Sequence, residues 1–253
     1  MPVLPEFRLD GKVAFIAGEG DGLTPTLART LAEAGARVFT LGPHQRVVEG
    51  AMLEVSDLGG QALGLFGDPA DPVAVERALE TFLPLWGRVD ILVNNTRTPL
   101  GKPYEEMDQG EWEEVMGRNA GAAHNLCSQV GREMLQQGGG RIVNIISGLA
   151  ERGLWNSAAF CASQGAVLQL TRALALEWAR RNITVNAVGV GWLSGEDILE
   201  EEAQKELLTR YIPLKRKGRP EDVAPLVTYL SSDACEFVTG QVVYIDGGLM
   251  AHP

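Results

Sequence analysis

The sequence predicts an α/β protein whose doubly wound parallel sheet has about seven strands, with helices on both faces. Short apolar runs typical of fully buried parallel strands alternate with segments of helical periodicity along the 253 residues. A glycine-rich turn follows the first apolar run and leads into the first helical segment. Neither an internal repeat nor a linker interrupts this alternation, so we expect one domain over residues 1–253.

Each predicted element follows from its periodicity. The predicted strands are residues 12–17, 37–41, 62–66, 89–94, 141–146, 184–190 and 241–245. The predicted helices are residues 26–35, 73–83, 111–134 and 165–181. In the last of these helices Val167, Leu170 and Leu174 recur at helical spacing, which indicates an apolar face.

The segment 191–212 departs from the alternation because it is acidic and rich in helix-forming residues. It follows the sixth predicted strand, and ligands of open α/β sheets bind outside the carboxyl ends of the strands. We therefore expect a lid or a substrate loop here. A solvated surface helix is equally consistent with the three successive glutamates at 200–202.

Composition and charge argue against several classes of function. A net charge of −11 disfavours a nucleic-acid partner, because phosphate backbones are bound by clustered Lys and Arg. No apolar run approaches the ~20 residues of a membrane span, and the first residues lack the layout of a secretory signal, so we expect a cytoplasmic protein. The three cysteines and three histidines are dispersed, so the sequence predicts neither a disulfide framework nor a metal site.

Three residues in the middle of the chain carry the most informative pattern. Ser147 is followed thirteen residues later by Phe160, and Gln164 comes four residues after that. Together with the stretch ILVNN at 91–95 and the tail at 213–248, this pattern resembles the short-chain dehydrogenase/reductase family. The resemblance covers nearly the whole chain. It implies a Rossmann-type fold, an NAD or NADP cofactor and oxidoreductase chemistry.

The resemblance also assigns roles to these positions. In the family, a Tyr at the position of Phe160 moves the substrate proton, and a Lys at the position of Gln164 lowers the pKa of that Tyr. Ser147 and Asn119 match the family's substrate-binding Ser and its supporting Asn, so they are the candidate catalytic residues. Neither Phe160 nor Gln164 titrates, which implies a degenerate member without a competent proton-transfer pair. The alternatives are that Ser147 ties down a loop and that Asn119 bonds the backbone.

The glycine-rich turn corresponds to the family's pyrophosphate-binding turn. Gly18 and Gly22 match its first two glycines and Leu23 continues it, whereas Thr24 stands where the family has a third glycine. We expect Thr24 to cap the first helix, with Pro25 at the first helical position. We also expect the β-branched Thr24 side chain to press on the cofactor, so that binding of NAD or NADP is weak or lost.

Asp68 and Asn94 complete the candidate cofactor-binding residues. Asp68 matches the family's adenine-binding Asp, with a helix cap as the alternative, and Asn94 opens the family's N-N-A-G stretch. Arg97 ends that stretch where the family has a small residue, and it is a candidate anion ligand. Gly42 and Pro43 follow the second strand without any charge, so the sequence does not decide between NAD and NADP.

Three functions remain open. The sequence favours a non-catalytic structural or regulatory subunit of a homo- or hetero-oligomer, a dimer or a tetramer, paired with an active homologue. The predicted helices at 111–134 and 165–181 match the segments through which the family assembles, with core packing as the alternative for their apolar residues. The second function is an NAD(P)-dependent oxidoreductase, or a related enzyme, of non-standard chemistry. There Ser147 holds a substrate oxygen and Glu151, Arg152 or solvent handles the proton. The third is a nucleotide sensor that binds without turnover.

Overall fold

The computed structural model describes residues 5–18, 22–194 and 207–251. Within these ranges the chain forms a seven-stranded sheet in the order β3-β2-β1-β4-β5-β6-β7, and every neighbouring pair of strands is parallel. The strands are β1 (Val13–Gly18), β2 (Arg37–Gly42), β3 (Ala62–Phe66), β4 (Ile91–Asn95), β5 (Gly140–Ser147), β6 (Ile183–Val190) and β7 (Val242–Ile245). The predicted doubly wound fold is confirmed, and each of the seven predicted strands is present.

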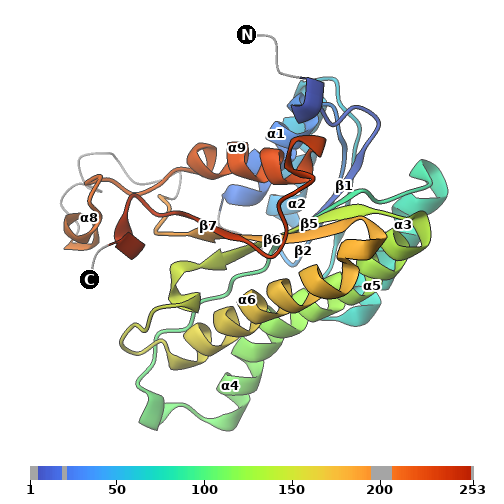
Figure 1. Cartoon of the computed structure of the whole chain (residues 1–253). Coiled ribbons are helices and arrows are strands. Elements are labelled where there is room, and N and C mark those ends of the chain that lie inside the picture. The colour runs from blue at the N-terminus through green and yellow to red at the C-terminus, as the bar shows by residue number, and fades with distance from the viewer. Residues whose placement is uncertain (1–4, 19–21, 195–206, 252–253) are drawn as a thin grey trace.

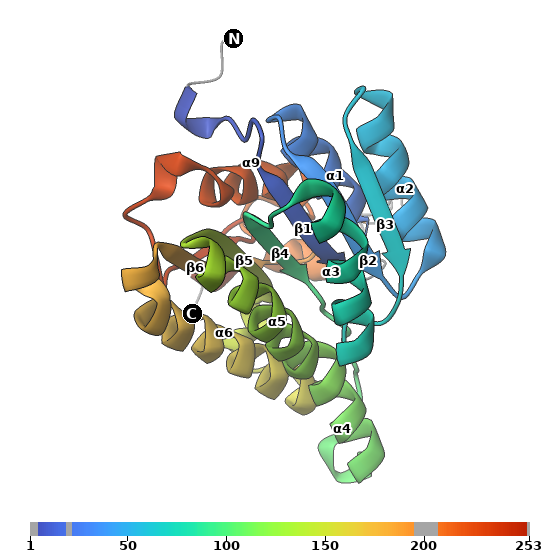
Figure 2. The same cartoon turned by 90° about the vertical axis from the view of Figure 1, so that its right-hand side faces the viewer.

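Helices cover both faces of the sheet (Figures 1 and 2). They are α1 (Leu23–Glu33), α2 (Gln45–Asp57), α3 (Pro72–Trp86), α4 (Gln109–Met116), α5 (Ala122–Gln137), α6 (Ala158–Trp178), α8 (Leu207–Tyr211) and α9 (Pro220–Ser231). Ile16 and Val93 of the sheet pack with α1, α2 and α9 on one face, whereas Phe15 and Leu92 pack with α3, α5 and α6 on the other. Alternate strand residues thus supply two cores, one on each face of the sheet, and the one-domain organisation stays a prediction.

Two helices differ from their predicted bounds in ways that matter for the site. The predicted helix at 111–134 contains a π-helical segment, Gly117–Gly121, between α4 and α5. Such segments are often found at functional sites, and this one contains Asn119. The helix predicted to begin at residue 165 begins at Ala158, so Phe160 and Gln164 lie one turn apart near its start.

Helices α2 and α9 have no counterpart among the predicted elements. In α2, Val48, Ala51 and Val55 are buried at helical spacing, which is the sequence signal that would have revealed it. In α9, Pro220 occupies the first turn and the Asp222 side chain accepts a hydrogen bond from the Arg219 backbone amide.

The apolar face predicted for assembly is largely core. Leu126, Val130 and Val167 are buried within the hydrophobic clusters, while Leu170 and Leu174 are partly buried against them. The predicted lid lies partly outside the described residues, because 195–206 fall between the described ranges. Among the helices that are described, none has the length and apolarity needed to cross a membrane.

Candidate active site

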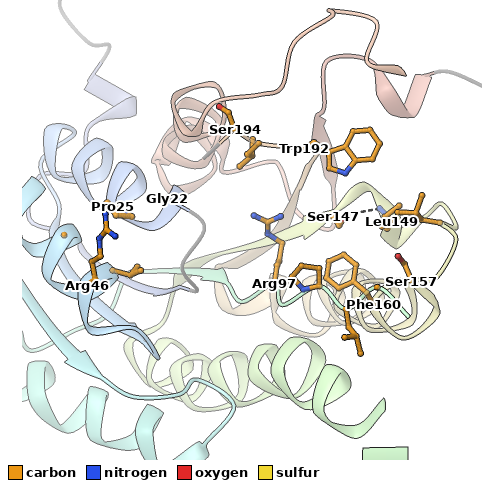
Figure 3. A pocket seen from close by; sticks show the side chains of 18 of the residues that line it. Gly22, Pro25, Arg46, Arg97, Ser147, Leu149, Ser157, Phe160, Trp192 and Ser194 are labelled. Atoms are coloured by element: carbon orange, nitrogen blue, oxygen red, sulfur yellow. Dashed lines mark hydrogen bonds between the residues drawn. The ribbon is translucent and has the colours of Figure 1, made fainter. Parts of the chain in front are cut away.

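A large cleft opens at the carboxyl edge of the sheet, where the strand order reverses between β1 and β4. This main cleft encloses about 900 Å³ and extends from Gly22 and Arg46 at one end to Ser147 and Phe160 at the other (Figure 3). Ligands of open α/β sheets bind at such switch points. The fold therefore brings Gly22, Ser147 and Phe160, three of the positions singled out in the sequence, to one cavity.

The first helix begins differently from the prediction. Its N-cap is Gly22, which has a left-handed backbone (φ 74°), and Leu23 is the first helical residue, so Thr24 is not the cap. Thr24 is fully buried and accepts a hydrogen bond from Asn95 Nδ2 at 3.1 Å. A Cβ on Gly18 would collide with Thr24 Oγ1, so the glycine makes room for the threonine. The prediction that Thr24 presses on the cofactor is corrected, because its side chain points into the protein.

Three predicted cofactor-binding residues, Leu23, Asn94 and Asp68, have structural partners in the protein. Leu23 is buried in the core cluster shared by α1 and the sheet. Asn94 is buried, and its Oδ1 accepts hydrogen bonds from the backbone amide and hydroxyl of Thr96, which stabilises the end of β4. Asp68 accepts from the Ala70 amide at 2.9 Å, whereas α3 is capped by Asp71. None of the three belongs to the described lining of the main cleft, so any contact with a cofactor stays a prediction.

The Ser147 end of the cleft is organised by the start of α6. Ser147 ends β5, and its backbone amide donates to Gln164 Oε1 at 2.8 Å. The Ser147 hydroxyl oxygen accepts from the Leu149 amide at 3.2 Å, which leaves the hydroxyl hydrogen able to donate to a ligand. Phe160 presents its ring beside this group (Figure 3). Gln164 is 1% exposed, and its Nε2 has no hydrogen-bond partner within the described part of the chain.

The Asn119 side chain forms its hydrogen bonds with backbone atoms. Its Oδ1 accepts from the Thr98 amide at 2.8 Å, and its Nδ2 donates to the carbonyl oxygens of Thr98 at 3.0 Å and Val115 at 2.9 Å. The residue is completely buried. These bonds fix the loop after β4 to the π-helical segment, which is the structural alternative that the sequence left open.

Two arginines line the main cleft. Arg97 extends into its middle, between Gly22 and Ser147, and its Nε donates to Asn95 Oδ1 at 3.4 Å (Figure 3). Arg46, on the first turn of α2, lies at the Gly22 end, and the sequence reasoning missed it. It could have been found only by recognising α2 first, because a basic residue in the first turn after β2 lies at the same edge of the sheet as Gly22.

The two proposed substitutes for the missing tyrosine have other partners. The Glu151 carboxylate accepts from the Tyr244 hydroxyl at 2.8 Å and pairs with Arg172 at 3.0 Å. Burial and the hydrogen bond to Glu151 raise the pKa of Tyr244 above its usual range. Arg152 donates to the carbonyl oxygen of Leu249 at 3.2 Å. Neither Glu151 nor Arg152 is among the described residues that line the main cleft. No cluster of three metal-ligating side chains occurs in residues 5–18, 22–194 and 207–251.

Comparison with known proteins places these features in a family. The family model described as enoyl-(acyl carrier protein) reductase matches residues 17–250. A 2-dehydro-3-deoxy-D-gluconate 5-dehydrogenase of Dickeya dadantii is 34% identical over 98% of this chain and 99% of its own length. A D-threitol dehydrogenase of Mycolicibacterium smegmatis is 33% identical over 96% of this chain and 94% of its own. The crystal structure of a gluconate 5-dehydrogenase from Burkholderia cenocepacia with NADP and tartrate superimposes with a TM-score of 0.88, at 32% identity and 98% coverage of both chains.

These relatives contradict the interpretation as a non-catalytic subunit. Proteins that match this chain over nearly its full length, at 32–34% identity, are named as active dehydrogenases. That interpretation rested on two positions, Phe160 and Gln164, and the full-length similarity points to an oxidoreductase. The predicted pairing with an active homologue depended on the same interpretation, so it is contradicted as well.

Proposed function

Because this chain belongs to the short-chain dehydrogenase/reductase family, we propose that it is an NAD(P)-dependent oxidoreductase with non-standard proton transfer. The observation that carries the proposal is the main cleft. It joins the N-terminus of α1 at one end to the Ser147 hydroxyl at the other. Phe160 and Gln164, at the positions of the family's Tyr and Lys, are the residues that make the proton transfer non-standard.

The residues of the cleft fit a dinucleotide. No atom of the described residues lies within 4 Å of where a Cβ would stand on Gly22, so a phosphate would have room to approach the N-terminus of α1 there. Arg46 and Arg97 add two guanidinium groups, the donors best suited to phosphate oxygens. The position of Arg46 near the end of β2 supports NADP over NAD, since a 2′-phosphate needs a cation there.

The bound dinucleotide supplies the hydride that is exchanged with the carbon of a carbonyl or alcohol. Ser147 would donate its hydroxyl hydrogen to the substrate oxygen and so stabilise the negative charge that develops there. Phe160 provides an apolar wall and no proton. The proton that the substrate oxygen gains on reduction would come from water, which reaches the half-buried Ser147 through the main cleft.

The test is Ser147→Ala, assayed by NADPH oxidation with a panel of ketones and aldehydes. We expect kcat/KM to fall by about 10²-fold or more, because one donor to a developing oxyanion is lost. Ser157→Ala is the matched control: Ser157 also lines the main cleft, but its hydroxyl donates to the Trp155 carbonyl oxygen at 3.2 Å. Unchanged turnover in Ser147→Ala would reject the proposal.

We further propose that cofactor affinity is weaker than in relatives that retain the Tyr and Lys. Pro25 lines the cleft without an amide hydrogen to offer, and Gln164 carries no charge. Calorimetric titration with NADPH and NADH measures this affinity and also tests the preference that Arg46 supports.

A homo-oligomer is the assembly that we propose. Leu176 of α6 is 84% exposed and Val243 of β7 is 41% exposed, so both of these elements present apolar surface. Light scattering on the eluted protein would measure the mass in solution, and a monomer would contradict the proposal.

A further inference from the structure

A second cavity adjoins the main cleft at Ser147. This side cavity encloses about 490 Å³, within the range of ~300–1,000 Å³ typical of small-molecule sites. Ser147, Leu149 and Trp192 line both cavities, so the side cavity opens directly beside the hydroxyl that would hold the substrate oxygen.

The wall of the side cavity is apolar. Its large apolar side chains come from the loop after β5, from the chain after β6 and from the C-terminal turn: Leu149, Leu154, Trp155, Trp192, Leu249 and Met250. Tyr211 of α8 adds an aromatic ring with a hydroxyl. The turn is held in place by Asp246, whose carboxylate accepts from the amides of Gly248 at 2.8 Å and Met250 at 2.6 Å. Met250 closes the floor against Gly148, since a Cβ there would lie 3.1 Å from Met250 Sδ. The cavity is therefore preformed.

The charged groups of the described lining have partners in the protein. Both carboxylate oxygens of Asp246 accept backbone hydrogen bonds from the C-terminal turn, and Arg152 donates to the Leu249 carbonyl oxygen from an exposed position. Tyr211 and Arg152 also line the cavity, but both are exposed, whereas the half-buried Ser147 hydroxyl stands at the junction with the main cleft.

From this wall we infer that the substrate is an apolar ketone or secondary alcohol whose hydrocarbon group occupies the side cavity while its oxygen lies at Ser147. The inference rests on the proposed oxidoreductase function and names its substrate class. A polyhydroxylated sugar acid would leave hydroxyl groups unpaired against Leu249, Met250 and Trp192, and each unpaired group would weaken binding by about tenfold. A hydrocarbon group instead gains from covering Leu154 and Trp155, which are 46% and 92% exposed.

The test compares two ketones by calorimetric binding to the full chain with NADP: 2-octanone, which is apolar, and 5-keto-D-gluconate, which is polyhydroxylated and anionic. We expect 2-octanone to bind more tightly. Met250→Gln keeps the side-chain length but places an amide in the cavity, and it should weaken 2-octanone binding by about tenfold. Met116→Gln is the matched control, because Met116 is half-buried and lies outside the described lining of both cavities.

Binding and turnover separate the two proposals. Tighter binding of 5-keto-D-gluconate, absence of 2-octanone binding, or equal 2-octanone affinity in Met250→Gln would each overturn the substrate class. NADPH oxidation is measured separately with both ketones. If 2-octanone binds with the expected sensitivity but no NADPH is oxidised, the substrate class stands and the proposed function fails. If only 5-keto-D-gluconate is reduced, the function stands and the substrate class fails.

Discussion

Replacing Asn119 with alanine tests whether this candidate catalytic residue acts through structure. The substitution removes three hydrogen bonds, two to Thr98 and one to Val115, all from a completely buried amide. At about 1 kcal/mol for each bond, Asn119→Ala should lower the free energy of unfolding by about 3 kcal/mol. For a chain of this size about 2–4 °C is lost per kcal/mol, so Tm should fall by about 6–12 °C.

Thermal unfolding followed by circular dichroism measures this change, with Asn125→Ala as the control. Asn125 follows on the same run of helix but has one short hydrogen bond, from Nδ2 to the Ala70 carbonyl oxygen at 2.8 Å, and a longer one to Pro69 at 3.4 Å. Asn125→Ala should lower the free energy of unfolding by less than half as much as Asn119→Ala. An Asn119→Ala protein with wild-type Tm and strongly reduced turnover would refute the structural reasoning and return Asn119 to the catalytic set.

Four further predictions follow from three positions. Phe160→Tyr places a phenol in the main cleft. The kcat for ketone reduction should then rise by about 10²-fold, which is the lower end of the rate gain from general acid–base catalysis. An unchanged kcat would mean that the side chain at position 160 does not reach the substrate. Burial raises the pKa of Cys127 from 9.0 to about 12, so its thiol should resist alkylation in the folded chain at about pH 8, and rapid labelling would contradict its burial. The pKa of this thiol is higher in the folded chain than in the unfolded chain. Its contribution to the free energy of unfolding is therefore complete below pH 9.0 and is lost as the pH rises towards about 12. Urea unfolding at several pH values measures this loss. Gly131→Ala would place a Cβ 2.5 Å from the Trp178 ring and should destabilise the packing of α5 against α6 by about 1–3 kcal/mol. Gly117→Ala is the control, because no atom of the described residues lies within 4 Å of the added Cβ. Equal melting temperatures for the two variants would refute the contact.

The strands were predictable because their signal is local. Residues 13–18 are buried at every position, and an unbroken apolar run of that length is readable from the chain alone. Helix α2 was missed although its buried positions recur at helical spacing, because apolar residues such as Leu53 also lie on its exposed side and its mean hydropathy is low. The start of α6 was placed seven residues late, since the stretch from Ala158 to Gln164 mixes small, polar and aromatic residues.

The site was predictable in part. Ser147 and Phe160 were singled out by the resemblance to the family, and both lie in the main cleft. The expected effect of Thr24 was wrong, because the direction of its side chain depends on Gly18 and on Asn95 of another strand. Arg46 was missed for the same kind of reason, since it lines the cleft only once α2 packs beside α1.

The sequence by itself determined the alternation of strands and helices and the parallel sheet. These depend on periodicity and spacing within short segments, which the order of residues contains directly. Only the tertiary structure decided which way Thr24 points, that Arg46 and Arg97 line one cleft, and that the C-terminal turn with Met250 closes an apolar cavity beside Ser147. Those features arise where segments distant in the chain pack together, and the shape and polarity of a cavity belong to that packing rather than to any one segment.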